Sequence, residues 1–275
     1  MAFLQEAEPA YGFELPVIPG VSRIVAPNPS VMTYHGTNTY LIDDGDSGLI
    51  VLDPGPYSDE HFAAVIAAGM GRIRGIIVSH SLSDHCGGSD VLREATGAPV
   101  FASKLASGTK FVIDRTLHEA DTIAGMKILV TPGHAVDHLC FERPDGIVFT
   151  ADHVMGWSSS IVSPPGGDMQ DYCESLAGML QRRHVMYLCG HGPAILDPAT
   201  HVRDLLRHRL RRESEIAAAI ARGPADPHSL MEQLYSKIDP VLKYAAERNV
   251  LAHLIKMQKE GKVELKGEQW YCRGG

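Results

Sequence analysis

The sequence has few of the features that mark secreted, disulfide-rich or membrane-spanning proteins. Its five cysteines are an odd, scattered set without a C-x-x-C pair, which favours reduced thiols buried as small apolar side chains over a disulfide framework. No segment approaches the roughly 18 apolar residues that a membrane-spanning helix needs. Residues 1–20 lack the basic start and the apolar run of a signal peptide. We therefore expect a cytoplasmic protein with no membrane association.

Positive charge is also scarce. The net charge of the 275 residues is −8, although residues 201–275 hold 14 Lys and Arg against 10 Asp and Glu. An acidic body does not attract polyanions, whereas a weakly basic C-terminal segment leaves RNA open as a partner. With 44% apolar residues, the chain can bury one large core, or a core and a small second domain.

Short apolar segments of strand length recur through the first two-thirds of the chain, each closed by Gly, Pro or Asp. They lie at 38–44, 48–54, 73–80, 99–103, 126–132, 138–142, 146–152 and 186–192. Helical patterns lie between some of them, at 58–70, 89–96 and 168–183. The alternation of strands and helices predicts an α/β body.

The last third of the chain has a different pattern. A long amphipathic helix is predicted at 200–223, and a proline-containing linker, two further helices and a two-stranded ribbon at 262–272 follow it. Helices followed by such a ribbon are typical of a winged-helix-like unit. We therefore predict two domains, residues 1–223 and residues 224–275.

Five polar motifs follow directly on predicted strands. They are LDPG at 52–55, SHSLSDH at 79–85, TPGH at 131–134, TADH at 150–153 and CGHG at 189–192. Strand ends in layered α/β proteins present their side chains to a common crevice. We therefore expect the five motifs to meet in one site.

These motifs supply imidazoles and carboxylates. The candidate metal ligands are His80, Asp84, His85, His134, Asp152 and His191. Such donors suit zinc, with iron or manganese as substitutes. Asp84 and His85 are adjacent, so both can reach one centre only where the backbone turns tightly, which the small residues between Ser81 and Gly88 permit.

The ordered set VLDPG, SHSLSDH, TPGHAVDH, FTADH and LCGHGP resembles the five signature motifs of the metallo-β-lactamase superfamily, between residues 34 and 193. The C-terminal unit is similar to the winged-helix extension of the β-lactamase-like subgroup, which includes an endoribonuclease. The resemblance implies a four-layered αβ/βα sandwich with a small C-terminal winged-helix-like domain. It also implies a metal-dependent hydrolase.

The resemblance further implies a role for each motif residue. It assigns His80 and His134 to a first metal, Asp84, His85 and His191 to a second, and Asp152 to both. Asp53 is expected to be structural, forming hydrogen bonds to the metal-binding loop without touching an ion. A further histidine of the family's first site is replaced here by Leu82, which has no lone pair. The second site is therefore expected to bind its ion more tightly.

The loss of this ligand leaves three outcomes open. The protein could hold two ions with an extra water in place of the imidazole, hold one ion in the second site, or bind metal and turn over poorly. In the first two outcomes, a hydroxide produced at the metal attacks a carbonyl centre. Asp84 is then the expected catalytic residue, because it can orient this hydroxide or take up its proton.

Several residues near the motifs have more than one interpretation. Those that could contact substrate or support a ligand, rather than only pack or turn the chain, are His35, His138, Met155 and Trp157. His153 is expected to point away from the metals. His201, His208 and the basic run at 207–212 are expected on the solvated face of a helix, with a phosphate-contacting strip as the alternative.

Three functions remain in view. The first is hydrolysis of a small carbonyl substrate, such as a β-lactam, an ester or a thioester. The second is endoribonuclease cleavage of single-stranded RNA, which would weaken steeply as the salt concentration rises. The third is a degenerate metal-binding module that uses its winged helix to bind a partner or nucleic acid.

Overall fold

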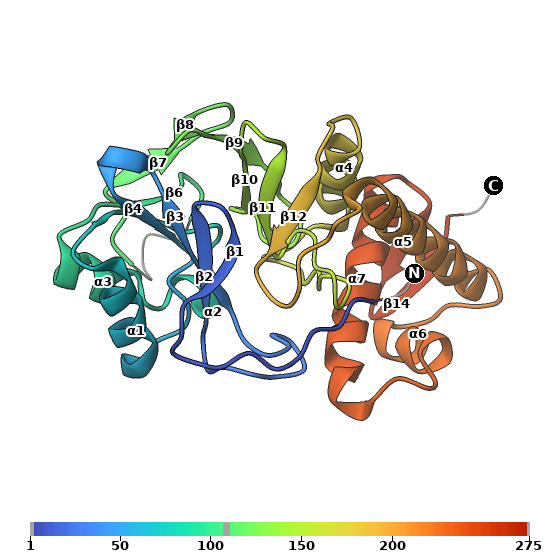
Figure 1. Ribbon diagram of the computed structural model, residues 1–275. Coiled ribbons are helices and arrows are strands. Elements are labelled where there is room, and N and C mark those ends of the chain that lie inside the picture. The colour runs from blue at the N-terminus through green and yellow to red at the C-terminus, as the bar shows by residue number, and fades with distance from the viewer. Residues whose placement is uncertain (1–2, 107–110, 274–275) are drawn as a thin grey trace.

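Two β-sheets pack face to face in the computed structural model, which describes residues 3–106 and 111–273 (Figure 1). Within these residues, the first sheet has seven strands in the order β1 to β7. They are β1 (Leu15–Ile18), β2 (Val21–Val25), β3 (Asn38–Asp43), β4 (Leu49–Leu52), β5 (Ile73–Ile77), β6 (Val100–Ser103) and β7 (Arg115–Leu117). Strands β1 to β4 run antiparallel to their neighbours, and β4 to β7 run parallel.

The second sheet has the strand order β12, β11, β10, β9, β8 in the described part of the chain. Its strands are β8 (Thr122–Ile123), β9 (Met126–Val130), β10 (Leu139–Glu142), β11 (Ile147–Ala151) and β12 (Met186–Cys189). Strands β11 and β12 are parallel, and the other pairs are antiparallel. One apolar cluster, which includes Leu52 and Ile77 of the first sheet and Phe141 and Phe149 of the second, joins the two inner faces.

Helices cover the outer face of each sheet. The helices on the first sheet are α1 (Asp59–Gly69) and α3 (Ser89–Thr96), and those on the second are α4 (Met169–Met179) and α5 (Pro198–Ile220). Phe62 of α1 and Leu92 of α3 are buried against the first sheet, and each such side chain contributes about 1.5–3 kcal/mol of transfer free energy. The resulting order of helix, sheet, sheet and helix confirms the predicted four-layered αβ/βα sandwich.

The C-terminal unit follows α5. It comprises α6 (Pro227–Leu234), the short 3₁₀ turn η2 (Pro240–Leu242), α7 (Lys243–Lys259) and a ribbon of β13 (Val263–Lys266) and β14 (Gln269–Cys272). This arrangement confirms the predicted winged-helix-like region. The last turns of α5, with Ile216 and Ile220, share an apolar core with α7 and with Trp270 of the ribbon. The division of the chain at 223/224 stays a prediction.

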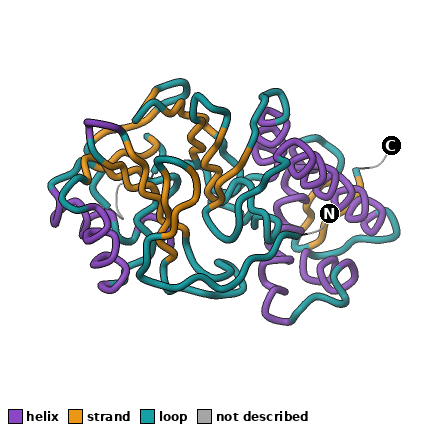
Figure 2. The backbone as a smooth tube through the Cα atoms, viewed as in Figure 1, coloured by secondary structure: helices purple, strands orange, loops and turns teal. Residues whose placement is uncertain are grey.

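Loops occupy the side of the molecule where the sheets meet the C-terminal helices. Figure 2 shows these loops, in teal, between the strands and the helices of the C-terminal unit. The first described residues also cross this side, and Leu4 N donates to the carbonyl of Gly156 (2.9 Å). The strand ends that carry the polar motifs open onto the same side.

The polar face of α5 departs from the prediction. Arg207 and Arg211 are exposed, as expected of a solvated face. His201 and Arg209, in contrast, are buried, because the helix packs on the loop that follows β11: His201 contacts the carbonyl of Met155 (2.9 Å). The prediction of a solvated face was therefore wrong for these two residues.

Two general predictions remain, namely that the cysteines are buried and that no helix spans a membrane. Cys86, Cys140, Cys173 and Cys189 are buried, as predicted, but Cys272 at the end of β14 is exposed, because the buried face of the ribbon ends with Trp270. Across residues 3–106 and 111–273, none of the helices is long and apolar enough to cross a lipid bilayer.

Candidate metal centre and adjoining cavity

The predicted ligands come from the ends of strands in both sheets. His80 follows β5, Asp84 and His85 lie on the one-turn helix α2 (Ser83–Cys86), His134 follows β9, Asp152 follows β11 and His191 follows β12. The structure brings all six together in two groups, whose donor atoms lie within 4.8 Å of one another in each group. One group is Asp84, His85, Asp152 and His191, and the other is His80, His134 and Asp152.

A helical turn, and not the expected loop, carries the adjacent pair. Asp84 and His85 lie in the first turn of α2, and the Oδ2 of Asp84 is 3.6 Å from the Nε2 of His85. The expectation that Asp84 and His85 reach one centre only at a tight turn of a loop was therefore wrong. Side chains one residue apart on a helix diverge by about 100°, which still allows two side chains of different length to reach one point.

The distances in the group of four match those around a metal ion. The Nε2 atoms of His85 and His191 each lie 3.4 Å from the Oδ1 of Asp152. The Nε2 of His191 is also 3.4 Å from the Oδ2 of Asp84. Tetrahedral zinc with bonds of about 2.0–2.1 Å places its ligands about 3.4 Å apart. These four side chains are thus spaced as zinc ligands.

The donor atoms that face the cluster have no other partner. In the described part of the chain, the Nε2 atoms of the four histidines and the Oδ1 of Asp152 are buried without a hydrogen bond. Leaving such atoms unpaired costs about 1–3 kcal/mol each, so an absent ligand is the simplest explanation. The residues present therefore fit a metal.

The opposite nitrogen of each ring is held by hydrogen bonds. The Nδ1 partners are Ser79 Oγ for His80 (2.9 Å), Asp53 Oδ2 for His85 (2.9 Å), the Ile161 carbonyl for His134 (2.6 Å) and the Gly36 carbonyl for His191 (3.1 Å). The carbonyl and carboxylate acceptors place the proton on Nδ1, as does Ser79 Oγ, which donates its own proton to Asp53, and the Nε2 lone pair then faces the cluster. This fixed tautomer prepares each ring for coordination.

Charge is concentrated on the group of four. Burial lowers the pKa of His191, but Asp152 and Asp84 outweigh it and raise this pKa to about 9. Burial also lowers the pKa of His85, but the same two carboxylates outweigh this effect and raise that pKa well above its ordinary value. For His80, burial and the neighbouring imidazole of His85 hold the pKa well below its ordinary value. The carboxylates therefore favour a cation most strongly at the group of four.

Asp53 and two residues absent from the predictions support the cluster. Asp53 has a positive φ of 53°, and its carboxylate accepts from Ser79 N and Ser79 Oγ (both 2.7 Å) as well as from His85. The carboxylate of Asp137 accepts from Ser81 N (2.8 Å) and fixes the same loop. A side chain at Gly190 would approach the Oδ1 of Asp152 to 2.6 Å. Both residues belong to motifs that the sequence analysis identified, Asp137 to TPGHAVDH and Gly190 to LCGHGP. Membership of these motifs was the signal that could have indicated their role.

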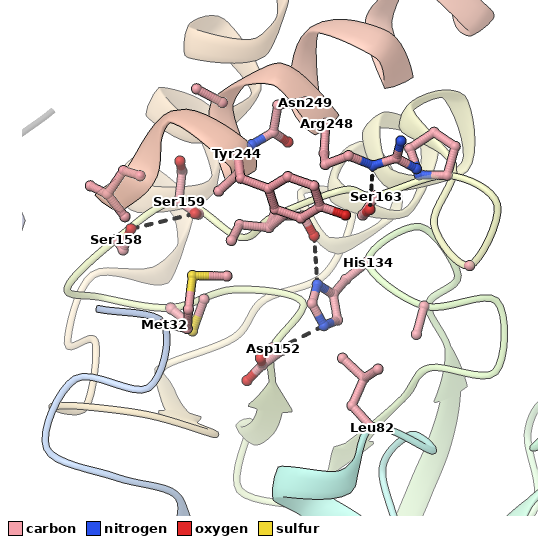
Figure 3. Close-up of a pocket in the computed structure, with 18 of the residues that line it drawn as sticks. Met32, Leu82, His134, Asp152, Ser158, Ser159, Ser163, Tyr244, Arg248 and Asn249 are labelled. Carbon is pink, nitrogen blue, oxygen red and sulfur yellow. Dashed lines mark hydrogen bonds and ion pairs between the residues drawn. The ribbon is translucent and has the colours of Figure 1, made fainter. Parts of the chain in front are cut away.

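Leu82 lies where the cluster opens to solvent. Its side chain is 39% exposed and lines a cavity of about 690 Å³ together with Asp84, His134 and Asp152. Figure 3 shows Leu82 beside Asp152 and His134 at one end of this cavity. The group of His80, His134 and Asp152 therefore has an apolar neighbour where a further ligand was expected.

The cavity also reaches the C-terminal unit. Met155 and Trp157, which were predicted to face substrate, line it, and the Trp157 ring stacks on Tyr34 with centroids 5.1 Å apart. Tyr244 and Arg248 of α7 line its other side. The sequence carried no signal for these two contacts, because they depend on how α7 packs against loops about 90 residues earlier.

Three of the histidines near the motifs lie outside the two groups. His138 is buried behind His80, with ring centroids 5.0 Å apart, and its Nδ1 contacts Thr131 Oγ1 (2.9 Å). His153 packs on Tyr172, and burial lowers its pKa to about 3. The ring of His35 contacts the carbonyl of Glu6 (3.3 Å) and is not among the residues that line the cavity.

A four-layered sandwich with a buried His and Asp cluster at its strand ends is an arrangement suited to metal-dependent hydrolysis. Comparison with known proteins agrees with this interpretation. A family model described as "Metallo-beta-lactamase superfamily" matches residues 32–111, and one described as "Beta-lactamase associated winged helix domain" matches residues 227–270. The chain belongs to the metallo-β-lactamase superfamily and is a hydrolase of that fold with a candidate metal site.

Individual relatives span nearly the whole chain. A Drosophila melanogaster protein named "Beta-lactamase-like protein 2 homolog" is 29% identical over 267 residues, which cover 89% of this chain and 90% of that protein. An "Atrochrysone carboxyl ACP thioesterase" of Aspergillus chevalieri is 28% identical and covers 99% of this chain and 95% of its own. The crystal structure of a β-lactamase domain protein from Burkholderia ambifaria matches with a TM-score of 0.83 at 20% identity, covering 98% of this chain and 96% of that chain.

Proposed function

We propose that this protein is a metal-dependent hydrolase of small carbonyl compounds, with a thioester as the preferred substrate and esters and β-lactams as further ones. The observation that carries the proposal is the set of buried, unpaired donor atoms that face one another in the cluster. Zinc is the metal that this donor set favours, with iron or manganese as substitutes. The similarity to proteins named thioesterases supports the choice of a thioester.

The residues have distinct parts in this proposal. When bound, a divalent metal makes hydroxide available at neutral pH by lowering the pKa of its water ligand to about 7. Asp84 lines the cavity with its side chain 25% exposed, against 7% for Asp152. Asp84 is therefore the carboxylate that a reacting water can reach, and it accepts the proton as the water attacks the carbonyl carbon.

The cavity walls favour an apolar acyl group. Met32, Leu82, Met155 and Trp157 line the cavity, and Figure 3 shows Tyr244 across it from Leu82. Such walls exclude water and hold a carbon chain while its carbonyl group lies at the cluster. A neutral ester or thioester body fits this lining better than a chain of phosphates does.

RNA cleavage is the enzymatic alternative, and the basic run of α5 offers it little support. Arg207 pairs with Asp204 (2.8 Å), and Arg212 pairs with Glu215 (2.5 Å). Arg209 is buried. These arginines are engaged within the protein and do not form a free strip for phosphate groups.

A rate comparison on the metal-replete protein tests the proposal. The substrates are a thioester, a chromogenic cephalosporin and a labelled single-stranded RNA, each at low and high salt. We expect the thioester to be hydrolysed fastest and its rate to change little with salt, whereas an RNA-cleaving activity would fall steeply. Turnover of RNA alone, or of none of the three, would refute the proposal.

Matched histidine variants control for folding. His134→Gln removes a cluster ligand and should lower kcat/KM for the thioester by about 100-fold or more. His118→Gln changes a histidine whose side chain is 58% exposed and that lies outside the cluster, and it should retain the activity. Equal activity of both variants would show that the cluster is not the reaction site.

A further inference from the structure

Positive charge gathers at the end of the cavity that faces the C-terminal unit. Arg209 of α5 and Arg248 of α7 both line the cavity, whereas Asp84 and Asp152 line the end at the cluster. Figure 3 shows Arg248 on α7, across the cavity from Asp152. The cavity is therefore bipolar, with apolar walls between its two charged ends.

Arg209 is a buried cation without a carboxylate partner. Its residue is 2% exposed, and no ion pair among residues 3–106 and 111–273 includes it. Its guanidinium donates to the carbonyl of Ser160 and to Asn249 Oδ1 (3.5 Å), and its Nε has no partner in the described structure. It also lies 5.2 Å from the centre of the Tyr172 ring. Burying a charge without an opposite charge is costly, so an anion at this end of the cavity would be stabilised.

Arg248 is half-buried and oriented by a neighbour. Its Nε donates to Ser163 Oγ (2.9 Å), and this bond is visible in Figure 3. Its terminal nitrogens take part in none of the ion pairs of the described residues. A guanidinium held at Nε presents its remaining N–H groups as a fixed fork, which matches the two oxygens of a carboxylate or phosphate.

Taking the thioester hydrolysis proposed above as its basis, we infer that the substrate carries an anionic group that Arg248 binds at this end of the cavity. The apolar walls hold the carbon chain between that anion and the reacting carbonyl. Arg209 adds positive charge and, through Ser160 and Asn249, holds the wall on which Arg248 lies. The anion is a carboxylate on the acyl group or a phosphate on the thiol part, and both offer the same charged oxygens.

Binding of thioethers tests the inference without turnover, because a thioether cannot be hydrolysed. Three matched thioethers are compared by calorimetry on the zinc-loaded protein: a neutral one, one with a carboxylate at the acyl end and one with a phosphate at the thiol end. A charge-assisted bidentate contact should make one anionic thioether bind about 10- to 100-fold more tightly than the neutral one. Whichever anionic compound shows the preference identifies the source of the anion.

Arginine variants locate the contact. Arg248→Gln should reduce the preference for the anionic thioether to near one, and Arg248→Lys should keep part of it, because lysine keeps the charge but loses the fork. Arg203→Gln, at an exposed position of α5 outside the cavity, is the control and should keep the whole preference.

The outcomes separate this inference from the proposed function. Equal affinity for all three thioethers, or a preference that Arg248→Gln leaves unchanged, overturns the anion site even where thioesters are hydrolysed. A preference that disappears in Arg248→Gln supports the anion site even if no thioester is turned over, and in that case only the proposed reaction fails.

Discussion

Replacing Leu82 by histidine should restore a ligand to the group formed by His80, His134 and Asp152. Leu82 precedes α2 with φ −73° and ψ 141°, an extended conformation that histidine also adopts. Its carbonyl accepts from the backbone N–H groups of His85 and the next residue (3.0 Å each), and these bonds do not depend on the side chain. Because the side chain is 39% exposed, Leu82→His should change the free energy of unfolding by less than about 1 kcal/mol.

The expected gain in metal affinity follows from the number of ligands. Structural zinc sites with four protein ligands bind with about 10–16 kcal/mol at neutral pH, or about 3 kcal/mol for each ligand. Since each 1.4 kcal/mol corresponds to a factor of ten, one added imidazole should tighten this group's zinc binding by about 100-fold. We expect fewer than two zinc ions per chain in the unsubstituted protein at modest metal concentration, and nearly two, with faster hydrolysis, in Leu82→His.

Elemental analysis at a fixed free zinc concentration, combined with titration against a competing chelator, measures this difference. Leu82→Ala is the matched control, because it removes the same apolar contacts without adding a lone pair, and its zinc content should stay that of the unsubstituted protein. Two tightly held ions in the unsubstituted protein would refute the reasoning. So would a zinc content in Leu82→His equal to that of Leu82→Ala.

Three further predictions concern the support of the cluster, a bound ion and the contact between α5 and the C-terminal unit. Asp53→Asn should weaken zinc binding about 10- to 100-fold, as measured by chelator competition. The reason is that an amide cannot accept from His85 while also keeping its other hydrogen bonds. Unchanged affinity would exclude a supporting role for Asp53. Zinc at about 100 times its Kd should add about 2.7 kcal/mol of stability in thermal unfolding, and His191→Gln should lose this gain; a gain that persists would place the ion elsewhere. Burial acts to raise the pKa of Glu213, but hydrogen bonds to basic neighbours, Lys256 among them (2.6 Å), hold it well below its ordinary value. A lowered carboxyl pKa contributes stability that is present above the unfolded-state value of about 4.3 and is lost as the pH falls further. Glu213→Gln should therefore cost about 3 kcal/mol in urea unfolding at pH 7 and much less near pH 3; a cost independent of pH would contradict this account.

The sequence allowed the layered fold and the ligand cluster to be predicted because both depend on local patterns. Apolar segments closed by Gly, Pro or Asp mark most strands of the two sheets, and the polar motifs stand directly after them. Strands β1, β2, β7 and β8 were missed. In β2, Ser22 and Arg23 interrupt the apolar residues, and the strand is recognised only by its pairing with β3.

The cavity could not be predicted in the same way. Tyr244 and Arg248 reach it only because α7 packs against the loop that follows β11, and Val162 N donates to Asn249 Oδ1 (3.0 Å) at this contact. The burial of Arg209 has the same origin. Periodicity within a helix shows which residues share a face, but not which distant loop will cover that face.

The placement of α7 has a consequence for how this protein can change in evolution. The candidate metal ligands stand at strand ends of the sandwich, whereas part of the cavity wall that we propose contacts substrate stands on a helix of the C-terminal unit. Mutations in that helix can alter which molecules are accepted while the chemistry stays intact. When related proteins evolve to accept different substrates, we therefore expect the first amino-acid changes to occur in α7.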